Sequence, residues 1–269
     1  MVAVKDVVVG ADLDRGGLRV EHASDGVCQV IFDRPGTSNA LDPDTAADLV
    51  RELRAIGADP NVRAVILTGA NGGFCSGADL NVIDRFSEVS EAEVTATLRH
   101  IMRASALLRD LSRPTIAVVG GPAVGAGMAL ALSCDVRIAS PSAILLPAFI
   151  RMGLLPDCGL SWLLPRMIGE GAALEMLIAG RAVDAERAER LGLFSQVCDD
   201  PMAAATELAR MFAARPPAAV AATKRLLRTV ATGSLDDAID AEAVAQAAAF
   251  HGAEFAEHFA AWRSHRNAD

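Results

Sequence analysis

The hydrophobic positions in the first two thirds of the chain fall mostly in short runs, which are typical of β-strands. Residues 18–22 and 27–32 are two such runs, separated by the turn residues Ser24-Asp25-Gly26, and they predict a β-hairpin. The β-branched run "VRAVILTG" at 62–69 and the apolar run at 115–119 predict two further, buried strands.

Helical periodicity appears between these strands and dominates after Trp162. Proline is favoured in the first turn of a helix, so a helix is predicted from Asp42-Pro43 to about Ile56, and residues 91–111 have a long amphipathic pattern. Two or three strands precede each helix, so simple strand–helix alternation fits poorly. The pattern predicts an α/β fold with a helical C-terminal region. Its Ala-rich tail, from about Pro216, should pack on its own core or on a neighbouring subunit.

One uncharged segment, from Pro114 to Cys134, is long enough to span a bilayer. Glycine and proline interrupt its centre at residues 120–127, however, where they would break a membrane helix. We therefore favour a buried strand at 115–119, a glycine-rich turn, and a buried helix near 126–133.

Composition narrows the functional classes. The 269 residues are 52% hydrophobic and 22% charged, which suits one large domain with a sizeable core. The net charge of −9 disfavours nucleic acid, whose phosphates attract basic patches. Five cysteines without a CxxC pair, and few histidines, indicate reduced thiols and no metal site. The N-terminus lacks the basic region of a secretory signal. We expect a cytoplasmic protein that binds neither nucleic acid nor a membrane.

Two glycine-rich loops are candidates for chemistry: "GGFCSGADL" at 72–80 and "GGPAVGAG" at 120–127. Each follows a β-branched strand and precedes a predicted helix. Such loops expose backbone N–H groups at a helix N-terminus, where partial positive charge collects. Two N–H groups that converge from the two loops would form an oxyanion hole.

Other interpretations of the loops compete with this one. The second loop reads GxxxGxG and lacks the GxGxxG spacing of a dinucleotide site, and the chain has no GxxxxGK[ST] phosphate loop. Ser76 could be a nucleophile with His100 as its base, but no GxSxG elbow surrounds it. The loops could also be two tight turns in which glycine supplies positive φ.

Several segments in a fixed order resemble the enoyl-CoA hydratase/isomerase superfamily, also called the crotonase superfamily. The resemblance runs from about Leu18 to Trp262. The segments that carry it are "FDRPGTSNAL" (32–41), "VRAVILTGANGGFCSGADL" (62–80), "RPTIAVVGGPAVGAGMALALSCDVRIAS" (113–140), the stretch 153–193 that begins "GLLPDCGLSWLLPR", and "ATKRLL" (222–227).

This resemblance implies a crotonase-like organisation and substrate. A spiral core of repeated ββα units should occupy residues 18–200, after an N-terminal extension over 1–17, and a helical trimerisation region should occupy 201–269. The implied substrate is an acyl-CoA thioester, with no cofactor beyond the coenzyme A that it contains. The implied assembly is a homotrimer or a dimer of trimers.

The resemblance also assigns an oxyanion hole, formed by the backbone N–H groups of Ala78 and Ala126, which would polarise the thioester carbonyl. Family hydratases use two glutamates to position and split a water molecule, and the matching positions here are Ala129 and Phe149. Neither side chain transfers a proton, whereas water addition needs an acid and a base. Hydration by the usual mechanism is therefore not expected.

Asp157 is the one acid that the resemblance places near this carbonyl. Isomerase-like members, such as the dienoyl-CoA and ring-epoxide acyl-CoA isomerases, use an aspartate base at this "LPD" position. The sequence around Asp157 is most similar to that of the ring-epoxide type. Apolar neighbours should raise its pKa by disfavouring the charged form. Asp157 is thus either the sole general acid/base of an isomerase or the N-cap of the next helix, two roles that can coexist.

Further residues are candidates for substrate contacts or loop structure. Gly36 replaces a basic residue that often follows the Arg-Pro pair, so one phosphate contact is missing. Asp79 is expected to be a structural hydrogen-bond acceptor. Basic residues of the tail either hold phosphate from a neighbouring subunit or are simply solvated. The candidates are Arg34, Ser76, Ala78 and Leu80 for coenzyme A, Phe149 and Trp162 for the acyl pocket, and Arg263, His265 and Arg266 in the tail.

Three functional hypotheses follow. The first is an acyl-CoA isomerase of an unsaturated or ring-derived acyl group, with Asp157 as its acid/base. The second is an enoyl-CoA hydratase of fatty-acid metabolism that positions water by another route. The third is an acyl-CoA-binding family member without catalysis, which would also fit the absence of both glutamates.

Overall fold

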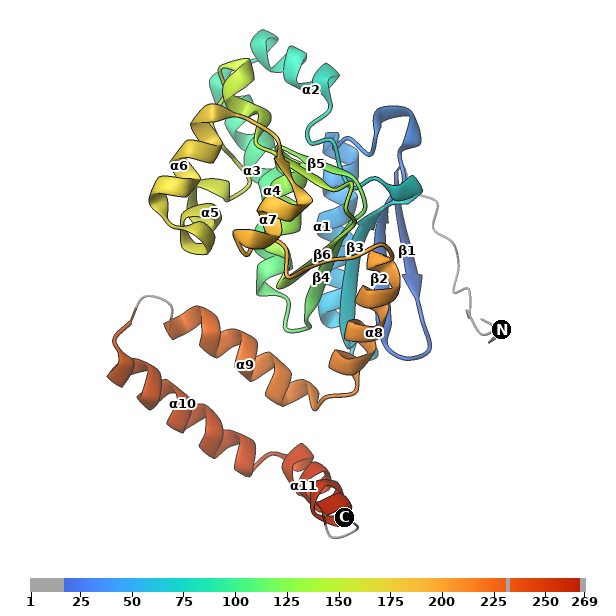
Figure 1. Ribbon diagram of the computed structural model, residues 1–269, viewed down its shortest axis with the longest axis vertical. Helices are drawn as coiled ribbons and strands as arrows, with labels where there is room; N and C mark the ends of the chain where they lie inside the picture. The colour runs from blue at the N-terminus through green and yellow to red at the C-terminus, as the bar shows by residue number, and fades with distance from the viewer. Residues whose placement is uncertain (1–16, 231–232, 267–269) are drawn as a thin grey trace.

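The structure is a computed structural model that describes residues 17–230 and 233–266. The predicted N-terminal extension, apart from Gly17, lies outside the described residues, as do the side chains of His265 and Arg266. Two sheets, the helices around them and a C-terminal helical arm make up the described chain (Figure 1).

The large sheet has six strands in the order β1-β2-β3-β4-β6-β9. β1 and β2 are antiparallel and form the predicted hairpin, with Leu18 opposite Phe32. All other neighbours in this sheet are parallel. The strands are β1 (Leu18–His22), β2 (Val27–Phe32), β3 (Ala64–Gly69), β4 (Thr115–Val119), β6 (Val136–Ala139) and β9 (Gln196–Val197).

A second, three-stranded sheet has the order β5-β7-β8 and contains β5 (Pro122–Val124), β7 (Ile144–Leu146) and β8 (Val183–Asp184). β4 and β5 precede helix α4, and β6 and β7 precede helix α5, so each pair gives one strand to each sheet. This is the ββα repeat that the family resemblance implied. It confirms the α/β fold class.

The helices of the core are α1 (Pro43–Ala58), α2 (Leu80–Arg85), α3 (Glu91–Asp110), α4 (Ala126–Ser133), α5 (Leu160–Ile168), α6 (Glu170–Ala179), α7 (Ala185–Arg190) and α8 (Pro201–Ala213). Short 3₁₀ segments are η1 (Pro35–Thr37), η2 (Ala70–Gly72), η3 (Phe86–Glu88) and η4 (Ala148–Met152). Asp42 caps α1 by accepting from the Thr45 N–H at 2.8 Å, as its Asp-Pro start predicted.

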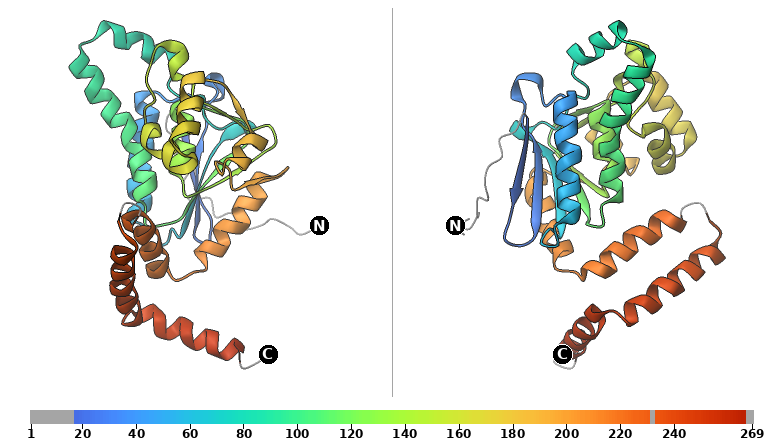
Figure 2. Two further views of the ribbon diagram at one scale, coloured as in Figure 1. Left: turned by 60° about the vertical axis from the view of Figure 1, so that its left-hand side comes forward. Right: turned by 180° about the vertical axis from the view of Figure 1, so that it is seen from behind.

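Alternation along the strands divides the core between two layers. Val65 and Leu67 pack with buried residues of α1, α3 and α4, whereas Ala64 and Ile66 point to the opposite face and pack with buried residues of α8. Accordingly, α1 and α3 lie on one side of the large sheet and α8 on the other (Figure 2). Every residue of α4 is buried. This helix accounts for the uncharged segment, and within the described chain no helix is long and apolar enough to cross a membrane.

Three further helices form the C-terminal arm: α9 (Pro217–Thr229), α10 (Leu235–Phe250) and α11 (Ala253–Arg266). α8, the first helix of the predicted C-terminal region, covers the large sheet, whereas α10 lies against α9 away from the core (Figure 1). α9 is anchored to the core where Lys224 and Arg228 pair with Asp135. The separation of core from arm thus falls after α8.

All five cysteines are unpaired, and Cys28, Cys75, Cys134 and Cys158 are buried. Burial raises the pKa of the Cys75 thiol to about 12, so this thiol stays protonated near neutral pH. The reduced thiols match the expectation from cysteine spacing. The cytoplasmic location itself stays a prediction.

Candidate active site at the two glycine loops

The two glycine loops lie in direct contact, and particular glycines make this possible. A Cβ atom on Gly127 would lie 2.3 Å from the carbonyl oxygen of Cys75, and one on Gly77 would lie 2.6 Å from that of Val124. A short β-bridge joins Cys75 to Ala123 across the same contact. Any side chain at these two glycines would push the loops apart. Which glycines are needed for this contact, and which for turning the chain, could not be predicted from the spacing of the glycines alone.

The Ala78 N–H is directed by a second β-bridge, to Leu41. Leu41 donates to the Gly77 carbonyl at 2.7 Å and accepts from the Asp79 N–H at 2.8 Å. Both hydrogen bonds of this parallel bridge are therefore made by the residues that flank Ala78, which are Gly77 and Asp79. The N–H of Ala78 itself points away from Leu41. Leu41 therefore orients the predicted donor, a role that sequence reasoning missed although the residue ends the "FDRPGTSNAL" segment.

The Ala126 N–H belongs to the first residue of α4, where no intrahelical acceptor exists. Gly125, just before it, has a φ of 51°, a left-handed value that glycine tolerates. Within the described residues, neither the Ala78 nor the Ala126 N–H donates a hydrogen bond. The site of a Gly77 Cβ lies 3.6 Å from the Ala126 nitrogen, so the two free donors are neighbours. The loops are tight turns, and they also bring two donors together.

The positions of the two missing glutamates are apolar. Ala129 is fully buried within α4. The Phe149 ring lies against Gly125, with its Cζ 3.6 Å from the site of a Cβ there, and Phe149 is 7% exposed. The side chain beside the start of α4 is therefore aromatic, and it carries no group that could transfer a proton.

Asp157 lies between η4 and α5 and does not cap the helix. The N-cap of α5 is Gly159, at a φ of 87°, and no side chain accepts from the first turn. Only the main-chain carbonyl of Asp157 accepts from this region, from the Leu160 N–H at 2.9 Å. The capping interpretation is therefore wrong, because Cys158 and Gly159 both have left-handed φ values and turn the chain before the helix starts.

The Asp157 side chain is half-buried, and one of its carboxylate oxygens has no partner among the described residues. Its Oδ1 atom is buried and makes no hydrogen bond with the described residues. Burial raises the pKa of Asp157 above its ordinary 3.8, and an interaction with the Cys158 thiol opposes this rise without cancelling it. A carboxylate in this state is a stronger base than a solvated one, and perturbed acids of this kind concentrate at functional sites.

Asp157 is close to the glycine loops through its neighbour Cys158. Burial raises the pKa of the Cys158 thiol, and the Asp157 carboxylate and the Cys75 thiol raise it further through their electrostatic effect. Cys75 belongs to the first loop and touches Gly127 of the second. Asp157 is thus connected to the loops that carry the two free N–H donors through Cys158 and Cys75.

The predicted coenzyme A contacts lie along the first loop. The Ser76 hydroxyl donates to the Thr37 carbonyl at 3.0 Å, and Leu80 is 69% exposed at the start of α2. Asp79 caps α2 by accepting from the Asn81 N–H at 3.0 Å, the structural role expected for it. The guanidinium group of Arg34 is engaged inside the protein, by the Ala40 carbonyl and the Asp42 carboxylate.

Trp162 lies elsewhere. Its ring is 44% exposed between the guanidinium groups of Arg109 and Arg166, at 4.8 and 4.1 Å. Arg109 lines the same cavity as Asp135, which follows the C-terminal end of α4, whereas Ala126 starts that helix. The assignment of Trp162 to the acyl pocket stays a prediction.

Comparison with known proteins agrees with the resemblance. Residues 22–269 match the family model described as enoyl-CoA hydratase/isomerase. The chain is 34% identical over 252 residues to the 1,2-epoxyphenylacetyl-CoA isomerase of Escherichia coli, covering 92% of this chain and 96% of the relative.

Two solved structures share the fold. An enoyl-CoA hydratase from Bacillus anthracis superposes with a TM-score of 0.87 at 30% identity, covering 93% of this chain and 96% of its own. An enoyl-CoA hydratase/isomerase from Cupriavidus metallidurans has a TM-score of 0.81 at 35% identity, with coverages of 88% and 89%. The chain therefore belongs to the enoyl-CoA hydratase/isomerase family.

Proposed function

We propose that this family member is an acyl-CoA isomerase with Asp157 as its single general acid/base. The observation that carries the proposal is the buried, unpartnered Oδ1 of Asp157 in the region of two free backbone donors. The apolar residues Ala129 and Phe149, where hydratases carry glutamates, favour isomerisation over hydration. The similarity to an epoxyphenylacetyl-CoA isomerase favours it as well.

The proposed reaction moves one proton and no other atom. The thioester carbonyl accepts hydrogen bonds from the Ala78 and Ala126 N–H groups, which makes the α-proton more acidic. Asp157 removes that proton, and the electron pair spreads over the dienolate, whose oxygen carries the negative charge between the two donors. Asp157 then returns the proton to the γ-carbon, so the double bond shifts by one position. We propose that no cofactor is needed beyond the coenzyme A of the substrate.

This arrangement suits a single-base reaction because the donors are fixed before the charge develops. Ala126 begins α4, and the partial positive charge of the helix N-terminus adds to its hydrogen bond. Phe149 keeps the neighbouring surface apolar, so a water molecule has no carboxylate to orient it for addition to the β-carbon. The dienolate would therefore be reprotonated at the γ-carbon, and the conjugated thioester that results would not be hydrated.

A panel of α,β- and β,γ-unsaturated acyl-CoA thioesters in heavy water tests the proposed function. The expected result is interconversion of the two isomers, followed by ultraviolet absorbance of the conjugated thioester, with no gain of a hydroxyl group by mass spectrometry. Loss of the conjugated absorbance with gain of a hydroxyl would establish hydration instead. Binding of acyl-CoA with no change in any thioester would establish a non-catalytic member.

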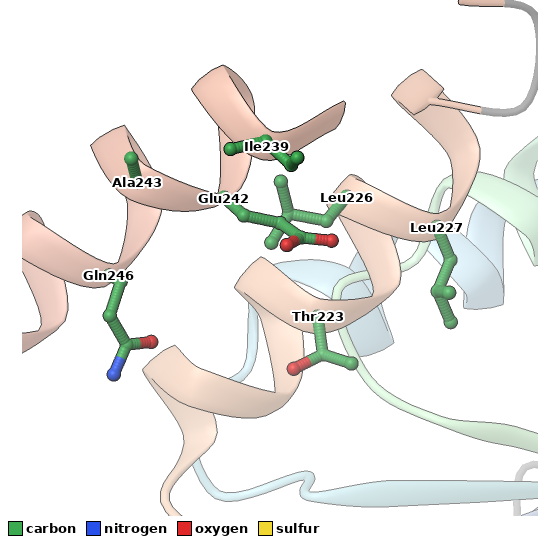
Figure 3. A pocket seen from close by; sticks show the side chains of 7 residues that line it. All are labelled: Thr223, Leu226, Leu227, Ile239, Glu242, Ala243 and Gln246. Carbon is green, nitrogen blue, oxygen red and sulfur yellow. The ribbon is translucent and has the colours of Figure 1, made fainter. Parts of the chain in front are cut away.

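The C-terminal arm supports a proposal about assembly. An open groove of about 540 Å³ lies between the contacting helices α9 and α10, with Leu226, Ile239 and Glu242 pointing into it (Figure 3). Large apolar side chains on the arm stay exposed in the single chain, among them Leu227 at 70%, Leu235 at 76% and Val244 at 73%. Exposed apolar surface of this kind marks interaction sites. We propose that the arm assembles the chain into a homotrimer or a dimer of trimers.

The double substitution Leu227→Glu and Val244→Glu is expected to convert the oligomer into monomers of 28.0 kDa, because each carboxylate would be buried at a subunit interface. Sedimentation velocity measures the mass. The matched control is Leu174→Glu on α6, which is 60% exposed outside the arm and should leave the assembly unchanged. A wild-type protein that sediments as a monomer would contradict the proposal.

A further inference from the structure

Arg34 connects two loops beside the proposed oxyanion hole. Its guanidinium group donates to the Ala40 carbonyl at 2.6 Å. The same group pairs with Asp42 at 2.9 Å and lies 3.6 Å from the carboxylate of Asp79. One planar, forked cation thus holds acceptors from two segments that are distant in sequence.

The two carboxylates occupy matching places on either side of the bridge that orients Ala78. Asp42 directly follows Leu41, and Asp79 directly follows Ala78, while Leu41 and Ala78 are the bridged pair. Each carboxylate also caps a helix, since Asp42 accepts from Thr45 and Asp79 from Asn81. Arg34 therefore ties the start of α1 to the start of α2, across the Leu41–Ala78 bridge.

Arg34 is itself held in place. The backbone N–H of Arg34 donates to the side-chain oxygen of Asn39 at 2.9 Å. The side-chain amide of Asn39 donates in turn to the carbonyl of Phe74, in the first glycine loop, at 3.2 Å. Gly17 lies over its aliphatic stem, where an added Cβ would come within 2.2 Å of the Arg34 Cγ. The guanidinium group thus has a fixed position.

We propose that Arg34 is a positioning residue that fixes the direction of the Ala78 N–H, and that it does not hold a coenzyme A phosphate. This inference rests on the proposed function, since it assigns Ala78 an oxyanion. The guanidinium group already lies beside two carboxylates, so the local charge is negative and disfavours a phosphate. Its side chain is only 20% exposed.

The charge of Arg34 also stabilises its partners. Burial raises the pKa of Asp42, but hydrogen bonds from Thr45 and the positive charge of Arg34 lower it by more, and the net shift is downward. Lysine at position 34 would keep the positive charge. Its single ammonium nitrogen could not contact Ala40, Asp42 and Asp79 at once, as the planar guanidinium group with its several N–H groups does. The position needs arginine for its geometry.

The variants Arg34→Lys, Arg34→Met and Asp79→Asn test the proposal. Asparagine at position 79 would still cap α2, but it would replace the carboxylate that lies beside the Arg34 guanidinium group with an uncharged amide. Each variant is expected to lower kcat about 10²-fold, because a small misplacement of a catalytic group has effects of this size. KM and the Kd for coenzyme A should change less than about threefold, and the double variant Arg34→Met/Asp79→Asn should lose little beyond either single change.

A spectroscopic readout separates positioning from folding. The infrared carbonyl band of a bound acyl-CoA thioester should shift to lower frequency in the wild type and shift less in each variant. Arg19→Met is the matched control, since Arg19 pairs with Glu21 and Asp33 on the surface, and it should keep the full shift.

Different failures have different outcomes. A higher Kd for coenzyme A with unchanged kcat and carbonyl shift would overturn the positioning role and establish a phosphate contact. If Arg34→Met does not fold, Arg34→Lys and Asp79→Asn decide by the same measurements, and unchanged kcat in both would overturn the inference. A wild type that neither turns over nor polarises any thioester would instead refute the proposed function.

Discussion

Replacing Asp157 with asparagine is expected to lower kcat by about 10²–10⁴-fold, the usual contribution of a general acid/base. Asparagine has nearly the same shape but cannot take up the α-proton. The fold should persist, because the carboxylate makes no helix cap and its Oδ1 makes no hydrogen bond within the described chain. Steady-state kinetics with an unsaturated acyl-CoA, together with circular dichroism, would measure both effects.

The raised pKa of Asp157 adds a dependence on pH with a defined sign. The base must be ionised to act, so kcat/KM of the wild type should fall as the pH drops through the raised pKa, which lies above 3.8. The stability also depends on pH. Between 3.8, the pKa of Asp157 in the unfolded chain, and its raised pKa in the folded protein, the folded protein still holds a proton that the unfolded chain has lost. The stability of the wild type therefore falls as the pH rises through that window and then levels off.

Asp157→Asn removes this titration, so the variant should unfold at a temperature equal to or above that of the wild type at neutral pH. The difference should shrink as the pH falls toward 3.8. Active sites often lose stability for function in this way. Asp200→Asn is the matched control, since Asp200 caps α8 through Ala203 and asparagine caps equally well. A folded Asp157→Asn variant with wild-type kcat would refute the assignment.

Ala126→Pro is expected to lower kcat by about 10²–10³-fold, as does the loss of one oxyanion-hole donor in other enzymes. Proline lacks the N–H, and its ring carbon would occupy the place of the hydrogen. The helix should tolerate it, because Ala126 is the first residue of α4 and proline is favoured there. Kinetics and the infrared band of the bound thioester carbonyl would report the lost donor.

Ala126→Gly is the matched control for this substitution, since it keeps the N–H and changes only the methyl group. It should retain kcat within a few-fold of the wild type. Equal kcat values for the proline and glycine variants would mean that the Ala126 N–H contributes nothing to catalysis, and the oxyanion hole would have to be assigned to other groups.

Much of the fold follows from local sequence patterns. The hairpin at 18–32, the strand at 115–119 and the helix that starts at Pro43 all appear as predicted, because turn residues, β-branched runs and caps act locally. The glycine loops were also predictable as donor sites, since a glycine loop followed by a helix exposes N–H groups whatever the fold around it.

Contacts between distant segments were not predictable from pattern alone. The approach of Leu41 to Ala78 and the pairing of Arg34 with Asp79 depend on which loops become neighbours in the spiral. The position of the Trp162 ring between two arginines, one of them on α3, depends likewise on which helices pack side by side. The cap at Asp157 was displaced by two residues with left-handed φ, one of them a cysteine.

The most direct test of a single-base isomerase follows the proton itself. A β,γ-unsaturated hexenoyl-CoA carrying deuterium at the α-carbon would be incubated with the wild type in ordinary water, and the product analysed by mass spectrometry and NMR. We predict a conjugated product with part of the deuterium at the γ-carbon, because a single half-buried carboxyl group takes and returns the label. A hydroxylated product, or unchanged label transfer in Asp157→Asn, would contradict the account.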